Sequence, residues 1–265
     1  MKKVTVLLVF LTLLIVSCSS NDDEYATNTT LTFNMFHTWG DEEVTKEDFD
    51  ELKYVNANED TLSISQYRYL LSNFYVVNDS GYATSLLDYV LIDLGEESNL
   101  TFTADALLLN DTYDLYFRFG FEDADNYVEG GYADLNTVNF NVGENLGGGY
   151  HYMQFDGEYL DNEGLESGFN YHAIRAVDLS QTSEDGTLFT VDTSYEVYLG
   201  EVEIEDYKAE VAINVDLSQW FESPNLWDLN VYNQMLMMNF EAQRLMMENA
   251  ANVFSLVEED EEDDE

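Results

Sequence analysis

Apolar residues recur at every second position along several stretches of this chain. In the first stretch Leu31, Phe33, Met35 and His37 alternate with other residues. The same spacing returns in three later stretches, at 113–121, 151–155 and 207–215. Successive side chains of a β-strand point to opposite faces, so each stretch has the pattern of a strand with one face in a core.

Clusters of turn-forming residues separate these stretches, for example at 78–81, 147–149 and 183–186. The chain shows no regular alternation of helical and strand patterns, which a parallel sheet with crossover helices would require. The sequence therefore predicts an all-β fold, an antiparallel β-sandwich.

One helix is expected near the C-terminal end. From about Leu229 to Ala251 the apolar residues fall on one face of a helix, which predicts an amphipathic α-helix packed on the sheets. This segment carries five methionines: Met235, Met237, Met238, Met246 and Met247. Thioethers can bind copper(I), but the same spacing suits packing in a core, which is the simpler interpretation.

The N-terminal residues have the pattern of an export signal. Lys2 and Lys3 precede an apolar run, which predicts a signal peptide over residues 1–17. The run ends at Cys18 in a sequence that resembles the bacterial lipobox, which implies that Cys18 is lipidated; the alternative is a buried free cysteine. The acidic residues 22–24 resemble the signal that sends Bacteroidetes lipoproteins to the outer face of the outer membrane.

The charge of the chain excludes one class of partner. It has 54 Asp and Glu against 9 Lys and Arg, a net charge of -45, so phosphate backbones are repelled and nucleic acid is not expected as a ligand. The 19 Tyr, 16 Phe and 3 Trp still supply enough apolar surface for a core. We expect a lipidated tether at 18–28, one folded domain at 29–257 and a solvated acidic tail at 258–265.

The three histidines, His37, His151 and His172, all lie in strand-like segments. Neutral imidazole is a good ligand for copper(II) and zinc, and lipidation of the single cysteine would leave no thiolate to compete. Three imidazoles that converge from three strands would form a metal centre. The alternative, three separate hydrogen-bonded histidines, stays open on spacing alone.

Other motifs give little support to catalysis or to a second metal site. Asp123, Asp125, Asn126 and Glu129 could offer oxygen ligands to calcium, but the glycine and closing glutamate of a calcium loop are missing. The chain has no nucleophile elbow, no phosphate-binding loop and no His-Glu-x-x-His motif. We therefore expect a protein that is not an enzyme.

Five segments taken in order resemble the family of MbnP-like copper-binding domains, whose members include a protein encoded beside methanobactin genes. The segments are 31–37, 62–74, 147–153, 169–172 and 248–254. The resemblance implies a β-sandwich with a mononuclear copper site, and it places His37, His151 and His172 at the ligand positions. It also implies, for some members, a tryptophan oxidised to kynurenine by a dihaem partner of the cytochrome c peroxidase type. Here Trp39 follows His37, the reverse of the order in the best-studied members.

These features together predict a lipoprotein of the outer membrane, facing the periplasm or the cell surface, that binds copper through histidines. The alternative is an extracellular ligand-binding or adhesion module without metal, in which exposed Tyr and Trp side chains stack on sugars or peptides. Histidines that lie together would favour the metal, and scattered histidines would favour the alternative.

Overall fold

The computed structural model describes residues 25–182 and 186–257. The predicted signal peptide, the predicted lipidation site Cys18 and the expected acidic tail at 258–265 lie outside these residues. Within the described part, no helix is long and apolar enough to cross a membrane.

The smaller sheet is built around the first strand, β1 (Thr27–Trp39). On one side β1 pairs with β14 (Lys208–Asp216), which in turn pairs with β15 (Phe254–Leu256). On the other side it pairs with β7 (Thr101–Leu108) and, further along, with the short β2 (Glu42–Glu43). The predicted alternation is confirmed in β1, where every second residue from Leu31 to His37 is buried.

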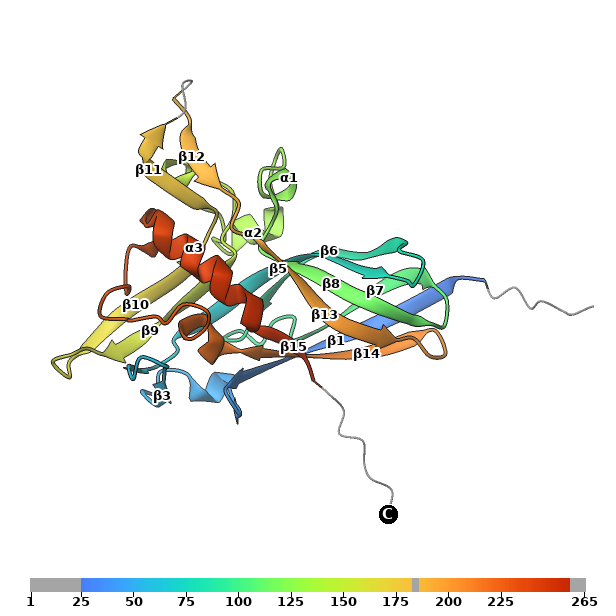
Figure 1. Cartoon of the computed structure of the whole chain (residues 1–265), viewed down its shortest axis with the longest axis horizontal. Coiled ribbons are helices and arrows are strands. Elements are labelled where there is room, and N and C mark those ends of the chain that lie inside the picture. Colours follow the sequence, from blue (N-terminus) through green and yellow to red (C-terminus); the bar gives the residue numbers. More distant parts are fainter. Residues whose placement is uncertain (1–24, 183–185, 258–265) are drawn as a thin grey trace, which may run out of the picture.

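The larger sheet has eight strands in the order β13-β8-β5-β9-β4-β3, with β6 on β5 and β10 on β9. Its strands are β3 (Tyr54–Val55), β4 (Thr61–Leu62), β5 (Gln66–Val77), β6 (Ala83–Asp93), β8 (Thr112–Phe119), β9 (Met153–Leu160), β10 (Glu166–Ala173) and β13 (Tyr195–Glu203). A separate hairpin of β11 (Ala176–Thr182) and β12 (Leu188–Val191) projects from the body of the molecule (Figure 1).

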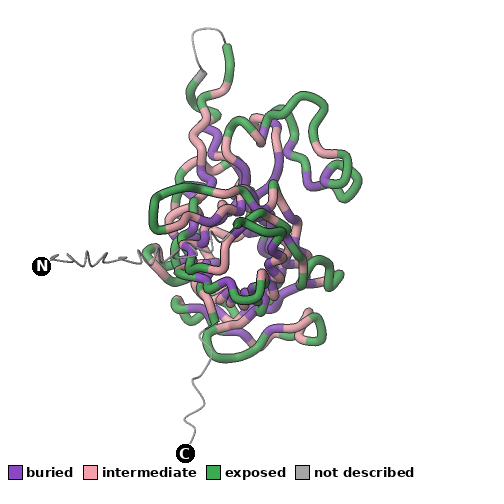
Figure 2. Tube along the Cα trace, turned by 90° about the vertical axis from the view of Figure 1, so that its right-hand side faces the viewer, coloured by how far each residue is buried: buried purple, intermediate pink, exposed green. Residues whose placement is uncertain are grey.

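The two sheets face each other across an aromatic core. Phe33 of β1 packs edge-on against Phe74 of β5, with ring centroids 5.3 Å apart, and Phe117 of β8 packs against Phe254 of β15 at 5.2 Å. Buried segments line the interior between the sheets, and exposed segments form the outer loops (Figure 2). Each such side chain contributes about 1.5–3 kcal/mol by its removal from water. The predicted β-sandwich with a C-terminal helix is confirmed.

One strand pair departs from the antiparallel pattern. β1 and β14 run parallel, with Thr30 beside Lys208 and Thr38 beside Asp216. A parallel pair needs a long connection, and here most of the chain, including the larger sheet, supplies it. Alternation within a strand does not reveal the direction of its partner, so the sequence alone gave no sign of this pairing.

Short helices connect the strands. They are the α-helices α1 (Asp123–Asn126), α2 (Ala133–Thr137) and α3 (Phe240–Asn249) and the 3₁₀-helices η1 (Lys46–Asp48), η2 (Glu144–Leu146), η3 (Leu217–Phe221), η4 (Leu236–Met238) and η5 (Ala250–Asn252). The helix expected from about Leu229 begins only at Phe240. The reason is that Met235 adopts a left-handed backbone with φ of 59°, which interrupts any helix that arrives from Leu229.

The start of α3 is fixed by Asn239, whose side-chain oxygen accepts a hydrogen bond from the backbone N–H of Ala242. We expect Asn239→Ala to lower the free energy of unfolding by about 1 kcal/mol, because one N–H of the first turn loses its acceptor. Urea unfolding followed by circular dichroism measures this change. An unchanged midpoint would contradict a role for the cap.

The methionines of the helical segment do not form one group. Met246 is buried in the core, whereas Met235 and Met238 are exposed. Packing therefore accounts for Met246 but not for the methionines around η4.

Candidate functional site

Two of the three histidines lie together at one end of the larger sheet. His172 is on β10 and points to the face opposite the core, because its neighbours Tyr171 and Ala173 are buried on the inner face. His151 precedes β9, and its backbone N–H donates to the carbonyl of Phe140 at 2.9 Å. The two imidazole centroids are 5.4 Å apart, and the ring planes are nearly perpendicular at 84°.

The hydrogen bonds of these rings assign their protons. Nδ1 of His151 lies 3.0 Å from the carbonyl oxygen of Phe140, and Nε2 of His172 lies 2.9 Å from Oδ1 of Asp156. A carbonyl or carboxylate oxygen can only accept, so each of these nitrogens carries the proton. In the neutral form of each ring the other nitrogen, Nε2 of His151 or Nδ1 of His172, carries a lone pair. Both are buried and have no hydrogen-bond partner among the described residues.

The electrostatics keep His151 neutral and Asp156 charged. Burial is the main cause that lowers the pKa of His151 to about 4; His172 and Arg68 also lower it, while the carbonyl of Phe140 and Asp156 oppose the shift. Burial on its own raises the pKa of Asp156, but the hydrogen bonds from His172 and Asn170 outweigh it, so this pKa lies below its usual range. Near neutral pH the site thus offers an unprotonated imidazole beside a carboxylate.

A polar lattice on the outer face of the sheet supports the histidine pair. Arg68 of β5, Gln154 of β9 and His172 of β10 lie side by side in register. Oε1 of Gln154 accepts from Nε of Arg68 at 2.6 Å and from Nε2 of Gln66 at 3.1 Å. Asp156 follows on the same face of β9 and accepts from Asn170 as well as from His172.

The backbone at His172 is held from the other side by α3. Gln243, which is buried, donates from Nε2 to the carbonyl of His172 at 2.8 Å and accepts at Oε1 from the N–H of Ile174 at 2.7 Å. A side chain of the C-terminal helix therefore fixes the end of β10.

His37 lies elsewhere, in the core between the sheets. Its Nε2 is 3.0 Å from the hydroxyl of Tyr69, and its ring packs against the rings of Tyr67 and Tyr69. Burial lowers its pKa to about 3. Tyr67 and Tyr69 belong to the inner face of β5, whereas Arg68 belongs to the outer face with His172. Of the three predicted ligands, the structure brings together His151 and His172 and places His37 on the opposite face of the sheet.

The expected position of His151, on the face of Met153 and Phe155, is corrected by the structure. The chain bends at Tyr152 and β9 begins only at Met153, so the alternation does not extend back to His151. Trp39 also lies apart from the histidine pair: its ring packs against Tyr54 and Phe221.

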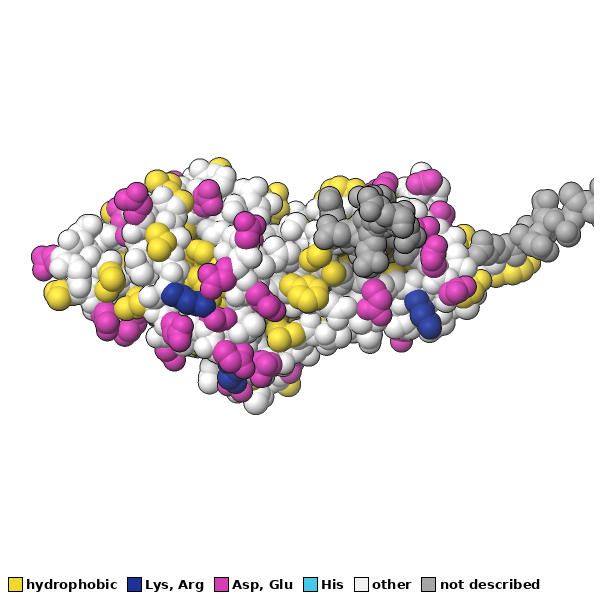
Figure 3. Space-filling view, turned by 90° about the horizontal axis from the view of Figure 1, so that it is seen from below, with side chains coloured by type: hydrophobic (Ala, Val, Ile, Leu, Met, Phe, Trp, Pro, Cys, Tyr) yellow, Lys and Arg dark blue, Asp and Glu magenta, His cyan; other side chains and the backbone are white. Residues whose placement is uncertain are grey.

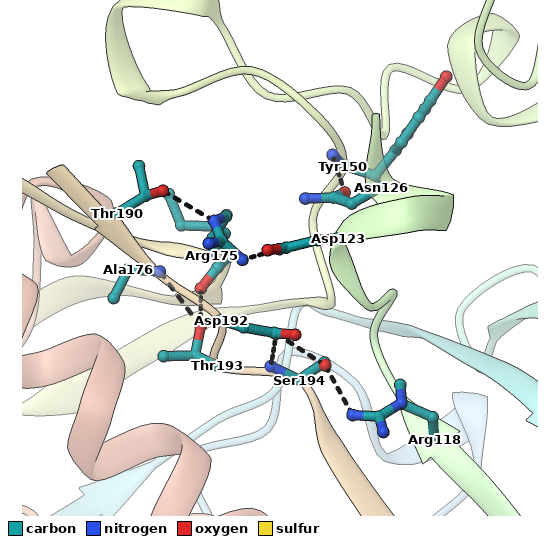
Figure 4. A network of polar contacts seen from close by, with 11 residues as sticks. Arg118, Asp123, Asn126, Tyr150, Arg175, Ala176, Thr190, Asp192, Thr193 and Ser194 are labelled. Carbon is teal, nitrogen blue, oxygen red and sulfur yellow. Dashed lines mark hydrogen bonds and ion pairs between the residues drawn. The ribbon is translucent and has the colours of Figure 1, made fainter. Parts of the chain in front are cut away.

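Three of the four possible calcium ligands make structural contacts. Asp123 forms an ion pair with Arg175, and Oδ1 of Asn126 accepts from the N–H of Tyr150 at 2.8 Å (Figure 4). Asp125 accepts from Asn73. Among residues 25–182 and 186–257, no group of three or more His, Cys, Asp and Glu side chains is placed to hold a metal ion.

The polar network around Arg175 joins α1 to the base of the β11–β12 hairpin (Figure 4). Nε of Arg175 donates to Thr190, and Asp192 accepts from Ser194, whose hydroxyl accepts from Arg118. Since Asn126 in α1 also holds Tyr150, this network fixes the backbone next to His151.

The two histidines of the pair differ in exposure: His151 is buried, whereas His172 is partly exposed beside Asp156. On the face of the molecule in Figure 3, Asp and Glu side chains outnumber Lys and Arg, and no histidine is seen. The carboxylates on that face therefore lie apart from the imidazoles.

Comparison with known proteins identifies the family of this chain. The family model named MbnP matches residues 28–239. A solved structure, MbnP from Methylosinus trichosporium, is similar with a TM-score of 0.48 and 12% sequence identity, over 76% of this chain and 80% of that one. No curated protein matches the chain. Because the family model spans most of the chain, this protein belongs to the MbnP family.

Proposed function

We propose that this protein binds a copper ion between His151 and His172. The observation that carries the proposal is the pair of buried imidazole nitrogens, Nε2 of His151 and Nδ1 of His172, that have lone pairs and no partner among the described residues. An unpaired buried polar atom costs free energy, and a metal ion would remove that cost at both nitrogens.

The separation of the rings is compatible with one ion. Metal–imidazole bonds are about 2 Å long, so two imidazoles on one ion have centroids no more than about 6 Å apart. The observed separation is 5.4 Å. The arrangement supplies two histidine ligands to one metal ion. Any further ligands would be water or groups other than a third histidine.

The hydrogen bonds opposite the lone pairs suit this role. Histidine ligands in metalloproteins usually donate their second N–H to a carboxylate or a backbone carbonyl, which orients the ring and makes it a better ligand. His172 donates in this way to Asp156, and His151 donates to the carbonyl of Phe140. The negative charge of Asp156 also favours a cation at the site.

Membership of the MbnP family associates this chain with copper rather than with another metal. Imidazole accepts copper, zinc and nickel, and copper(II) leads the affinity order of divalent first-row metals. We therefore expect copper(II) to displace zinc from this pair.

The test is a copper(II) titration of the mature domain against a weak competing chelator. We expect His151→Ala and His172→Ala each to weaken binding by about tenfold to a hundredfold, and Asp156→Asn by about tenfold. His37→Gln is the matched control, because it removes one imidazole without touching the site, and it should bind like the parent. Equal affinity in all four variants would mean that surface carboxylates hold the copper, and the proposal would be wrong.

We also propose that the domain is held at the outer membrane by a lipid on Cys18, with a dihaem enzyme as a possible partner by family. The net charge of -45 supports a lipid anchor, since a surface this acidic gives no attraction to anionic headgroups. Cys18→Ala should move the protein from the membrane to the soluble fraction. Membrane retention of that variant would overturn the anchor.

A further inference from the structure

Arg68 is an arginine without an ion pair among the described residues. The other three arginines each pair with an acid: Arg118 with Glu196, Arg175 with Asp123, and Arg244 with Glu241 and Glu248. The chain has 54 acidic side chains with which an arginine could form an ion pair. A half-buried guanidinium that stays unpaired in such a chain is available to a ligand.

The guanidinium of Arg68 is held in one orientation. Its Nε donates to Oε1 of Gln154 at 2.6 Å, and its Cζ lies 5.4 Å from the ring centroid of Phe140, which is fully buried. These two contacts fix one edge and one face of the group. The two terminal nitrogens remain without a partner among the described residues and form the fork that binds a carboxylate.

Arg68 borders a cavity of about 540 Å³ between the edges of the two sheets and α2. Most of the lining is apolar: Leu87, Val90 and Leu91 of β6, Phe102 of β7, Leu135 of α2 and the adjacent Val138. Small-molecule sites typically have about this volume, with apolar walls and a few polar groups that orient the ligand.

Acidic side chains on the same cavity limit the charge of a ligand. Asp93 is the cross-strand neighbour of Arg68, but its Oδ1 accepts from the N–H of Glu96 instead. Asp134 accepts from the hydroxyl of Tyr89. With three carboxylates on the lining, a phosphate or another dianion is repelled, whereas one carboxylate directed at Arg68 is tolerated.

We propose that this cavity binds a small monocarboxylic acid with an apolar body, whose carboxylate pairs with Arg68 and whose body lies against β6, Phe102 and α2. The site borders the histidine pair, because Gln154 and Phe140 contact Arg68 on one side and support the pair on the other. Arg68 itself is not one of the proposed copper ligands, and the carboxylic acid would bind without copper.

The test uses 2-naphthoate as the probe and its uncharged analogue 2-naphthamide, titrated by calorimetry into the metal-free full chain. We expect naphthoate to bind at least about tenfold more tightly than naphthamide, because a charge-assisted pair is lost in the amide. Arg68→Gln should weaken naphthoate by about tenfold or more. Arg244→Gln changes the net charge equally but lies on the surface of α3, so it should leave the affinity unchanged.

Three results would overturn the proposal: no binding of naphthoate to the parent, equal affinity for naphthoate and naphthamide, or full affinity in Arg68→Gln. If Arg68→Gln fails to fold, the comparison of the two probes on the parent still decides. Val138→Asp, on the cavity wall, should also weaken naphthoate. His172→Ala removes the other proposed copper ligand, whose side chain is hydrogen-bonded to Asp156 rather than to Phe140 or Arg68, and it should bind naphthoate like the parent. This result would separate the carboxylate site from the proposed copper site.

Discussion

Gly157→Ala is expected to destabilise the protein by about 4 kcal/mol or more. Gly157 lies in the middle of β9, and a Cβ at this position would collide with the backbone carbonyl oxygen of Ser63 and lie 2.7 Å from the ring of Phe169. The backbone oxygen cannot rotate away, and Phe169 is buried among Phe155 and Phe221. One methyl group therefore forces the sheet or the core to shift, which is the costly form of overpacking.

Gly168→Ala is the matched control for this effect. Gly168 is on the neighbouring strand β10, where a Cβ would find its nearest atoms at 3.9 Å, an ordinary contact distance. This variant should stay within about 1 kcal/mol of the parent, with some gain because alanine restricts the unfolded chain. Chemical unfolding of the purified variants measures both values. Equal stability of the two variants would contradict the expected collision, because it would mean that β9 can accommodate a Cβ at Gly157.

Acidification is expected to weaken the fold through His37. In the native state burial lowers the pKa of His37 to about 3, whereas in the unfolded chain the pKa is about 6.5. Between these two pKa values His37 binds a proton in the unfolded state but not in the native state. The free energy of unfolding therefore falls as the pH drops below about 6.5. Above about pH 6.5 His37 is neutral in both states and does not make stability depend on pH. By pH 5 the loss from His37 alone is about 2 kcal/mol.

Urea unfolding at pH 7, 6 and 5 tests this expectation, because few carboxylates titrate in that range. His37→Gln should lower stability at pH 7, since the contact with Tyr69 changes, but should flatten the pH dependence by about 2 kcal/mol. His151, with its pKa also lowered by burial, leaves a residual slope in that variant. An identical slope in parent and variant would mean that His37 is protonated in the folded protein.

The strands β1, β8 and β14 could be predicted because every second residue of each is buried and the residues between are more exposed, whereas β5, with a run of four buried residues, shows no such alternation. In β1 and β14 the buried residues follow the predicted spacing. The helix was placed too early because Val231, Met235 and Met238 continue the apolar spacing but are exposed and lie in a turn or at η4 rather than in α3. Apolar spacing over a short segment does not by itself show that the segment is helical or that its apolar side chains are buried.

The site was harder to predict than the fold. The sequence identified His151 and His172 by residue type. Their contact depends on the bend of the chain at Tyr152, and no local sequence pattern predicts that bend. Asp156 was missed because it is one of 54 acids. Its position two residues after Gln154, between buried residues of β9, was the one signal that it shares a face with His172.

The pairing of β1 with β14 determines when the molecule can fold. Asn34 and Glu210, which hydrogen-bond across these strands, are 176 residues apart in the sequence. The first strand made by the ribosome can pair early with β2 and β7, but its other edge has no partner until β14 is made, when the chain is almost complete. Such distant contacts make folding slow and leave one edge of β1 unpaired during synthesis. An unpaired edge strand is a site where another chain can add, so the incomplete molecule is open to aggregation until β14 has been made.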